Sequence, residues 1–182
     1  MVSASIKSSE IRFGECNKKL LEEVIFYGIS LGADFVELFI ENSDNSSVLA
    51  EEDFITNVSP SFSKGAGIRI FKDKRDGFVS TNDLSRHGLM RSISQAIEML
   101  DISKKTNKLI FNGLEKLKDY SKSKINWLNE VPTINEVSEK LLLSTKSLKK
   151  DKKVAVRKGS YARNWQEVII ASSDGTYATD IR

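Results

Sequence analysis

Hydrophobic residues change their spacing at about residue 34, and this change limits the folds open to the chain. From Asn17 to Leu31 they recur at helical spacing, which predicts an amphipathic helix that ends at Gly32. From Asp34 to Glu41 the pattern alternates between apolar and polar positions, which is typical of a strand with one buried face. A fold that joins helices to a sheet is therefore expected from the first forty residues.

Alternation of this kind continues as far as Thr81, interrupted by polar clusters. The run Asn42–Ser46 is a turn by composition, and the charged run Lys72–Gly77 is a hairpin turn. We expect five short strands, at Asp34–Glu41, Ser47–Ala50, Ile55–Ser59, the segment after Gly65 and Phe78–Thr81, with Asp53 in a turn. Their tight connections favour antiparallel pairing.

A second amphipathic helix is predicted from Leu84 to Leu100, capped by Asp83 or Ser85. Helix, strand meander and helix together indicate an α+β domain over residues 17–103, preceded by a flexible N-terminus at 1–16. Residues 104–132 are rich in lysine and have little periodicity, so we interpret them as a connector.

The last third of the chain, residues 133–182, is expected to hold a helix and antiparallel strands. A capping box at Thr133–Glu136 begins the helix, which runs to Leu148. Strands are expected at Lys153–Ala162, Trp165–Ser172 and Thr176–Arg182, with a hairpin turn at Ser173-Asp174-Gly175. The final strand has no covering helix, so we expect the start of a second sheet and of a second domain that is truncated at Arg182, with an edge open to pairing.

Composition excludes several functions. Cys16 is the single cysteine and His87 the single histidine, so a disulfide framework and a cysteine-rich zinc module are ruled out. No apolar run reaches the length of a spanning helix, so we expect no membrane association and a cytoplasmic location. The net charge of +3 is mild, and nucleic acid is not an expected partner, although lysines crowd the stretch Lys104–Lys124.

No catalytic centre stands out among the residues. Gly65-Ala66-Gly67 lacks the third glycine of a dinucleotide fingerprint, since position 70 is isoleucine, and a strand follows it. His87 has no second histidine with which to hold zinc, and its pairing with Cys16 as a nucleophile is unsupported. The carboxylates of Glu51-Glu52-Asp53 are neighbours in sequence, and strand geometry would spread them over both faces.

Several short motifs resemble one family in their order and spacing. They are GADFVELFIE at 32–41, VLAEE at 48–52, KGAGIRI at 64–70, DGFVSTND at 76–83, and WQEVIIASSDGT at 165–176 with DIR at 180–182. Together they resemble the N-terminal region of the TldD/PmbA proteins, also named modulators of DNA gyrase. The acidic run at 49–53 is more similar to the TldD branch than to the PmbA branch.

The resemblance implies a zinc metallopeptidase system that trims peptides and degrades small unfolded proteins. Its TldD-type subunit carries an H-E-x-x-x-H motif and pairs with a PmbA-type partner. The present chain has no such motif, because glycine follows its only histidine. We therefore carry over no catalytic, metal or cofactor residue, and expect zinc only in a full-length TldD-like protein. The motif residues proposed as structural or interface positions are Gly65, Gly67, Arg69, Gly77, Asp174 and Gly175.

Three functions remain open at this point. The leading one is a non-catalytic N-terminal region that supports a peptidase domain and a subunit interface, inactive on its own. The alternative is a stand-alone module that binds a peptide or protein along an open strand edge. The third and weakest is a nucleic-acid contact through Lys104–Lys124, which would show a steep dependence on salt.

Overall fold

The computed structural model describes residues 13, 16–100, 111–116 and 132–182. It divides into two compact units. Unit 1 takes the described residues of Met1–Asn42, Lys64–Ser121 and Glu167–Ile181, and unit 2 those of Ser43–Ser63 and Lys122–Gln166 together with Arg182. Three strands run from one unit into the other along the chain, and each unit is described by itself below.

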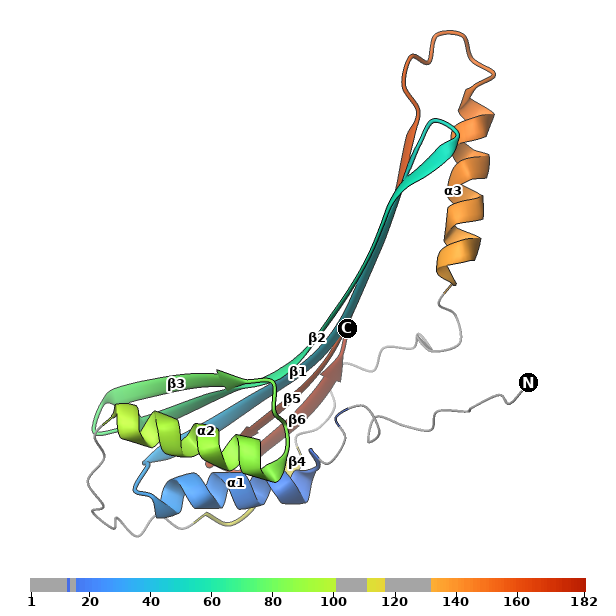
Figure 1. The fold of residues 1–182 in the computed structure, drawn as a ribbon. Coiled ribbons are helices and arrows are strands. Elements are labelled where there is room, and N and C mark those ends of the chain that lie inside the picture. Colours follow the sequence, from blue (N-terminus) through green and yellow to red (C-terminus); the bar gives the residue numbers. More distant parts are fainter. Residues whose placement is uncertain (1–12, 14–15, 101–110, 117–131) are drawn as a thin grey trace. The chain divides into compact units, whose positions relative to one another are not determined.

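Unit 1 is a sheet covered on one face by two helices that lie side by side (Figure 1). Helix α1 spans Lys18–Ser30, and the Asn17 side chain caps its first turn by accepting from the Leu20 N–H at 3.0 Å. Helix α2 spans Arg86–Met99, and Ser85 caps it in the same way through the Gly88 N–H. Both helices fall where the sequence predicts them.

In the strands that pack against these helices, buried and exposed side chains alternate, as expected for a sheet with one covered face. In strand β1, Phe35–Glu51, the buried positions at the start are Val36, Leu38 and Ile40. Strand β2, Phe54–Lys72, buries Ala66, Ile68 and Ile70 in its second half. It pairs there with β3, Arg75–Thr81, in an antiparallel register that sets Ala66 opposite Thr81 and Lys72 opposite Arg75. These apolar faces and those of α1 and α2 form one continuous core.

The prediction of five short strands between Asp34 and Thr81 is wrong in number. Asn42–Ser46 is not a turn but the middle of β1, and the segment from Ile55 to Phe71 is one strand. The polar run Asn42–Ser46 stays extended because β1 lies between β2 and β5 in the sheet, so both of its backbone edges can be paired. Ser43 and Ser46 are buried, and Asp44 accepts from Arg163 of β5 at 2.8 Å. The expected turn at Asp53 is present.

The last strands join the same sheet, which corrects the expectation of a second one. Strand β5 spans Lys158–Ser172 and strand β6 spans Thr176–Ile181, and the two are antiparallel. The sheet order is β3-β2-β1-β5-β6-β4, and the two-residue β4, Glu115–Lys116, is parallel to its neighbour β6. The α+β class with an antiparallel sheet is confirmed. The two strands predicted at Lys153–Ala162 and Trp165–Ser172 are the single β5, which begins only at Lys158.

Unit 2 contains helix α3, Ile134–Leu148, beside the parts of β1, β2 and β5 that belong to it. The predicted capping box is confirmed: the Thr133 hydroxyl accepts from the Glu136 N–H, and the Glu136 carboxylate accepts from the Thr133 N–H. The helix packs against β5 at Gly159, where an added Cβ would meet Leu141 at 3.1 Å. Val48 and Ala50 of β1 are buried in this unit, as is Val137 of α3.

Two expectations fall on parts of the chain that the structure describes only in part. The flexible N-terminus, 1–16, lies outside the described residues except for Phe13 and Cys16, and both of these are buried in the core of unit 1. The connector, 104–132, lies outside them except for 111–116 and Pro132. Among the described helices, none is long and apolar enough to cross a membrane.

Candidate functional site

The turn between β5 and β6 forms the first candidate site, in unit 1. Asp174 accepts from the Ser172 hydroxyl at 2.6 Å and from the Thr176 N–H at 3.0 Å. These two hydrogen bonds hold the pKa of the Asp174 carboxyl below its ordinary value, because they stabilise the charged form. Gly175 has a φ of 98°, which glycine adopts without strain. The predicted Asp-Gly turn is thus present in its expected form.

This turn is fixed to the elements around it. The Ser173 hydroxyl accepts from the Val36 N–H, and the Ser173 N–H donates to the Val36 carbonyl at 2.9 Å. On the other side, the Glu115 N–H donates to the Gly175 carbonyl at 2.6 Å. The Leu114 N–H donates to the carboxylate of Glu22 on α1.

A hollow of about 420 Å³ opens beside the turn. Its lining is mainly polar: Asn112, Gly113, Glu115, Ser173, Asp174, Gly175 and Thr176. These residues carry one side-chain amide, two hydroxyls and two carboxylates, so the hollow is suited to hydrogen bonding with a polar group. Two of the motif residues, Asp174 and Gly175, therefore lie together at one hollow.

The other four motif residues are separate from that hollow and serve the β2–β3 pair. An added Cβ at Gly65 would approach the Thr81 carbonyl at 3.0 Å, and one at Gly67 would approach the Phe78 ring at 3.1 Å. Gly77 faces α2, where an added Cβ would meet the Ala96 carbonyl at 3.1 Å. Arg69 is exposed and lies 4.0 Å from Asp76 across the strands. The two glycines of β2 thus permit close approach inside a sheet.

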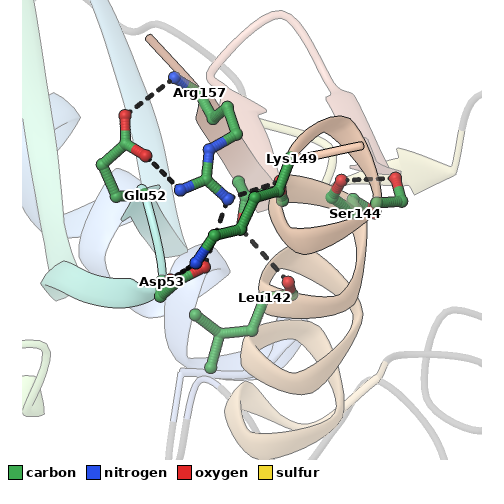
Figure 2. A network of polar contacts seen from close by, with 8 residues as sticks. Glu52, Asp53, Leu142, Ser144, Lys149 and Arg157 are labelled. Atoms are coloured by element: carbon green, nitrogen blue, oxygen red, sulfur yellow. Dashed lines mark hydrogen bonds and ion pairs between the residues drawn. The ribbon is translucent and has the colours of Figure 1, made fainter. Parts of the chain in front are cut away.

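The second candidate site is a cluster of charges in unit 2, centred on Arg157 (Figure 2). Its guanidinium donates to the carboxylate of Glu52, to Asp53 at 3.2 Å and to the Thr145 carbonyl of α3 at 3.1 Å. Lys149, which follows α3, donates to the other oxygen of Asp53 at 3.3 Å. One arginine therefore joins the β1–β2 turn to the last turns of α3, and Figure 2 shows its side chain between them.

The charged groups in this cluster shift one another's pKa values. Hydrogen bonding to Lys149 and to Arg157 holds the pKa of Asp53 below its ordinary value, although partial burial opposes the shift. Burial by itself would lower the pKa of Arg157, but its bonds to Glu52 and Asp53 raise it. Both groups are therefore charged across the physiological range.

The sequence did not predict this cluster, and it misplaced its carboxylates. Neighbours on a strand face opposite ways, but Glu52 lies in the turn with a φ of 55°, so Glu52 and Asp53 both reach Arg157. The arginine is more than one hundred residues away along the chain. The only local signal in the sequence was the pair of adjacent acidic residues, because two neighbouring carboxylates in a turn favour a basic side chain close to them.

The other residues considered for chemistry stay apart. His87 is exposed in the first turn of α2. Cys16 is buried in the core of unit 1, and this burial raises the pKa of its thiol to about 11. Within the part of the chain that the structure describes, no three His, Cys, Asp or Glu side chains are grouped so as to hold a metal ion.

Comparison with known proteins agrees with this arrangement of helices and strands. Residues 36–100 match the family described as PmbA/TldA metallopeptidase domain 1. A curated relative, the metalloprotease TldD homolog of Buchnera aphidicola, is 23% identical over 159 residues, which are 82% of this chain and 30% of that protein. Residues 36–100 are thus similar to the first domain of the PmbA/TldA metallopeptidases, and both comparisons support a relation to the TldD/PmbA family.

Solved structures show the same fold as this chain. TldE from Thermococcus kodakarensis superposes with a TM-score of 0.71 at 23% identity, over 89% of this chain and 36% of that one. A protein from Bacteroides thetaiotaomicron named as a candidate modulator of DNA gyrase gives 0.69 at 19% identity, over 91% and 38%. The chain thus spans about a third of the length of the relatives it matches. Its assignment to the TldD branch stays a prediction.

Proposed function

We propose that this chain serves as the non-catalytic N-terminal region of a TldD-like metalloprotease, which trims peptides and degrades unfolded ones. The match of residues 36–100 to the first domain of the metallopeptidase family carries this proposal. The sequence supports it, since a single histidine followed by glycine cannot supply an H-E-x-x-x-H motif. In this role the chain supports the peptidase domain and contributes to an interface with a TldD- or PmbA-like subunit, within the cytoplasm.

The two candidate sites fit different parts of that role. In this role the polar groups around the hollow at Asp174 and Gly175 bond to a neighbouring domain or subunit. Hydrogen bonds to β1 and to 111–116 hold the backbone of the hollow in place for this contact. The Arg157 cluster ties the β1–β2 turn to α3 within unit 2. We propose both as supporting features and assign no catalytic residue to either.

The test measures zinc content and peptide cleavage in the purified 182-residue chain. We expect no stoichiometric zinc after dialysis and no cleavage of an unstructured peptide, and the same result for His87→Ala. A TldD-type peptidase that lacks its own first domain should regain activity when this chain replaces that domain. Stoichiometric zinc with chelator-sensitive cleavage by the purified chain would overturn the proposal.

A second function, peptide binding by strand addition, is favoured by one observation. Strand β6 lies near the edge of the sheet, with β5 on one side and the two-residue β4 paired with Thr176 and Tyr177 on the other. An extended peptide could add to this edge. Saturable binding of an unstructured peptide by the chain, lost when Thr179→Pro removes a backbone donor, would support this second function.

A further inference from the structure

The end of α3 and the segment that joins it to β5 carry a dense run of basic residues in unit 2. Residues 146–158 contain six lysines and one arginine, but Asp151 is their single acidic residue. The Asp151 N–H donates to the Leu148 carbonyl at 3.2 Å, and the Val154 N–H donates to the Asp151 carbonyl at 3.1 Å. The basic side chains are therefore presented on a backbone that its own hydrogen bonds hold in place.

Three of the seven basic side chains of this segment have acidic partners in the turn between β1 and β2. Lys149 and Arg157 bond to carboxylates of that turn, as Figure 2 shows. Lys158 forms an ion pair with Glu51 at 3.1 Å. The charges of these three side chains are thus balanced within the chain.

The other four lysines have no acidic partner within ion-pair distance among the described residues. They are exposed, and together with Asp151 they give a net charge of +3, as large as that of the whole chain. Lys146 lies in the last turn of α3, where a cation compensates the helix dipole. The helix end does not account for Lys150, Lys152 and Lys153, which follow it.

Apolar side chains are exposed beside these lysines. Leu148 is 47% exposed, Val154 is 36% exposed and Val156 is 60% exposed. Exposed apolar groups among charged ones are typical of an interaction surface. The name lysine surface is used below for the four lysines and the three apolar residues together: Lys146, Leu148, Lys150, Lys152, Lys153, Val154 and Val156.

Nucleic acids, anionic membranes and acidic peptides all offer charges that lysines can bind. Residues 146–158 contain no aromatic residue, so they offer no platform for base stacking and no aromatic anchor for a membrane surface. An acidic peptide with aliphatic residues matches both parts of the lysine surface, because its carboxylates pair with the lysines and its aliphatic side chains pack on the valines. A lysine ammonium, unlike a guanidinium, imposes no paired geometry, so it accepts carboxylates at varied spacing.

From these observations we infer that the lysine surface binds unfolded, acidic peptide segments that also carry aliphatic residues. The contact is weak and reversible, since each exposed ion pair contributes little free energy. It lies in unit 2, apart from the edge of β6, and it requires no peptidase activity. The inference therefore holds or fails independently of the proposed function.

Fluorescence anisotropy of a labelled peptide tests the role of charge. The probe is an unstructured peptide of Asp, Glu, Val, Gly and Ser, and a second probe carries Asn and Gln in place of Asp and Glu. The 182-residue chain should bind the acidic probe saturably and about tenfold or more tightly than the amide probe. Added salt should weaken this binding, because ions screen the lysines.

Charge reversal locates the binding on the lysine surface. The combined variant Lys150→Glu, Lys152→Glu and Lys153→Glu should bind the acidic probe about tenfold more weakly, because three exposed ion pairs are replaced by repulsion.

The matched control is Lys19→Glu, Lys74→Glu and Arg75→Glu, which reverses the same number of exposed charges in unit 1 and should leave binding unchanged. Equal losses in the two combined variants would overturn the inference, since the overall charge alone would then decide binding.

A third probe, with Ser in place of Val, tests the apolar part of the lysine surface. Val156→Ser should weaken binding of the Val-containing probe and leave binding of the Ser probe unchanged. The absence of saturable binding to the acidic probe would overturn the inference. So would binding of duplex DNA or of phosphatidylserine vesicles without binding of the peptide, or loss of peptide binding in Thr179→Pro with no effect of the lysine substitutions.

Discussion

In unit 1 the buried apolar residues of α1, α2, β1 and β2 form one continuous cluster, whereas unit 2 is held differently. Among the described residues of unit 2, the buried apolar side chains are those of Val48, Ala50 and Val137. Beside them Arg157 and Thr145 are buried and hydrogen-bonded to each other. Unit 1 thus depends on the removal of apolar surface from water, and unit 2 on a few directional polar contacts.

The turns of the two units also differ in the groups that stabilise them. Asp174 in unit 1 is held by neutral donors within two residues of it, whereas Asp53 in unit 2 is held by two cations about one hundred residues away along the chain. A turn stabilised by its own neighbours forms from local sequence. A turn stabilised by distant cations forms only when the rest of its unit is in place.

The largest expected effect is a loss of stability from the core of unit 1. Ile25 is fully buried between the helices and the sheet, so Ile25→Ala should lower the free energy of unfolding by about 2–5 kcal/mol. Phe26 is its neighbour on α1 and is 62% exposed, so Phe26→Ala should change it by less than about 0.5 kcal/mol. Urea denaturation followed by circular dichroism measures both. Equal losses in the two variants would contradict the description of unit 1.

A smaller and more local effect is expected from the polar contacts of unit 2. Arg157→Met removes the bonds to Asp53 and to the Thr145 carbonyl while keeping much of the side-chain volume. The last turns of α3 should then open more often, so the amides near Leu148 should exchange with solvent faster, on the order of tenfold. Lys158→Met, which removes only an exposed ion pair with Glu51, should leave those amides unchanged.

Unchanged exchange in Arg157→Met would show that α3 is held by its apolar contacts alone. The comparison between the two units would then fail for unit 2, since Val48, Ala50 and Val137 would suffice to fix the helix.

The smallest expected effect is on carboxyl titration, and it separates the two turns. Asp53 and Asp174 both have pKa values below the ordinary one when folded. Each therefore contributes stability at neutral pH that is lost as the pH falls below about 4, through the folded-state pKa. Raising the salt concentration should bring the pKa of Asp53 back toward its ordinary value, because ions screen Lys149 and Arg157. Asp174, held by neutral donors, should respond little.

Carboxyl carbon shifts followed by NMR at low and at high salt would measure this difference. Salt responses of equal size at Asp53 and Asp174 would contradict the assignment of the two carboxylates to ionic and neutral partners.

Features of the fold that depend on residues close together in the sequence were predicted, whereas features that depend on residues far apart were not. Helices α1, α2 and α3 were placed correctly because their apolar spacing and their caps lie within a few residues. The middle of β1 was missed because Asn42–Ser46 has the composition of a turn, and only pairing with β2 and β5 keeps it extended. The partnership of β5 with β1 joins segments separated by α2 and α3, and no local pattern encodes it.

The same distinction applies to the candidate sites. The turn at Asp174 and Gly175 was predicted from the sequence because an Asp-Gly pair between two strands is itself the signal of a turn. Arg157 was not found, because lysines and arginines are frequent in 149–158 and nothing local singles out the one that is buried. The glycines at 65, 67 and 77 were identified by the family motif, and the structure shows the close approaches that require small residues there.

The position of β1 inside the sheet also determines when this sheet can form during synthesis. Residues 18–99 are made first, and they contain α1, α2 and the three strands β1, β2 and β3. One edge of β1 stays without its partner until the ribosome has released β5, residues 158–172. Pairing over such a separation is slow, and an unpaired central strand is prone to aggregate. While residues 100–157 are being synthesised, β1 therefore has one edge that its partner β5 cannot yet cover.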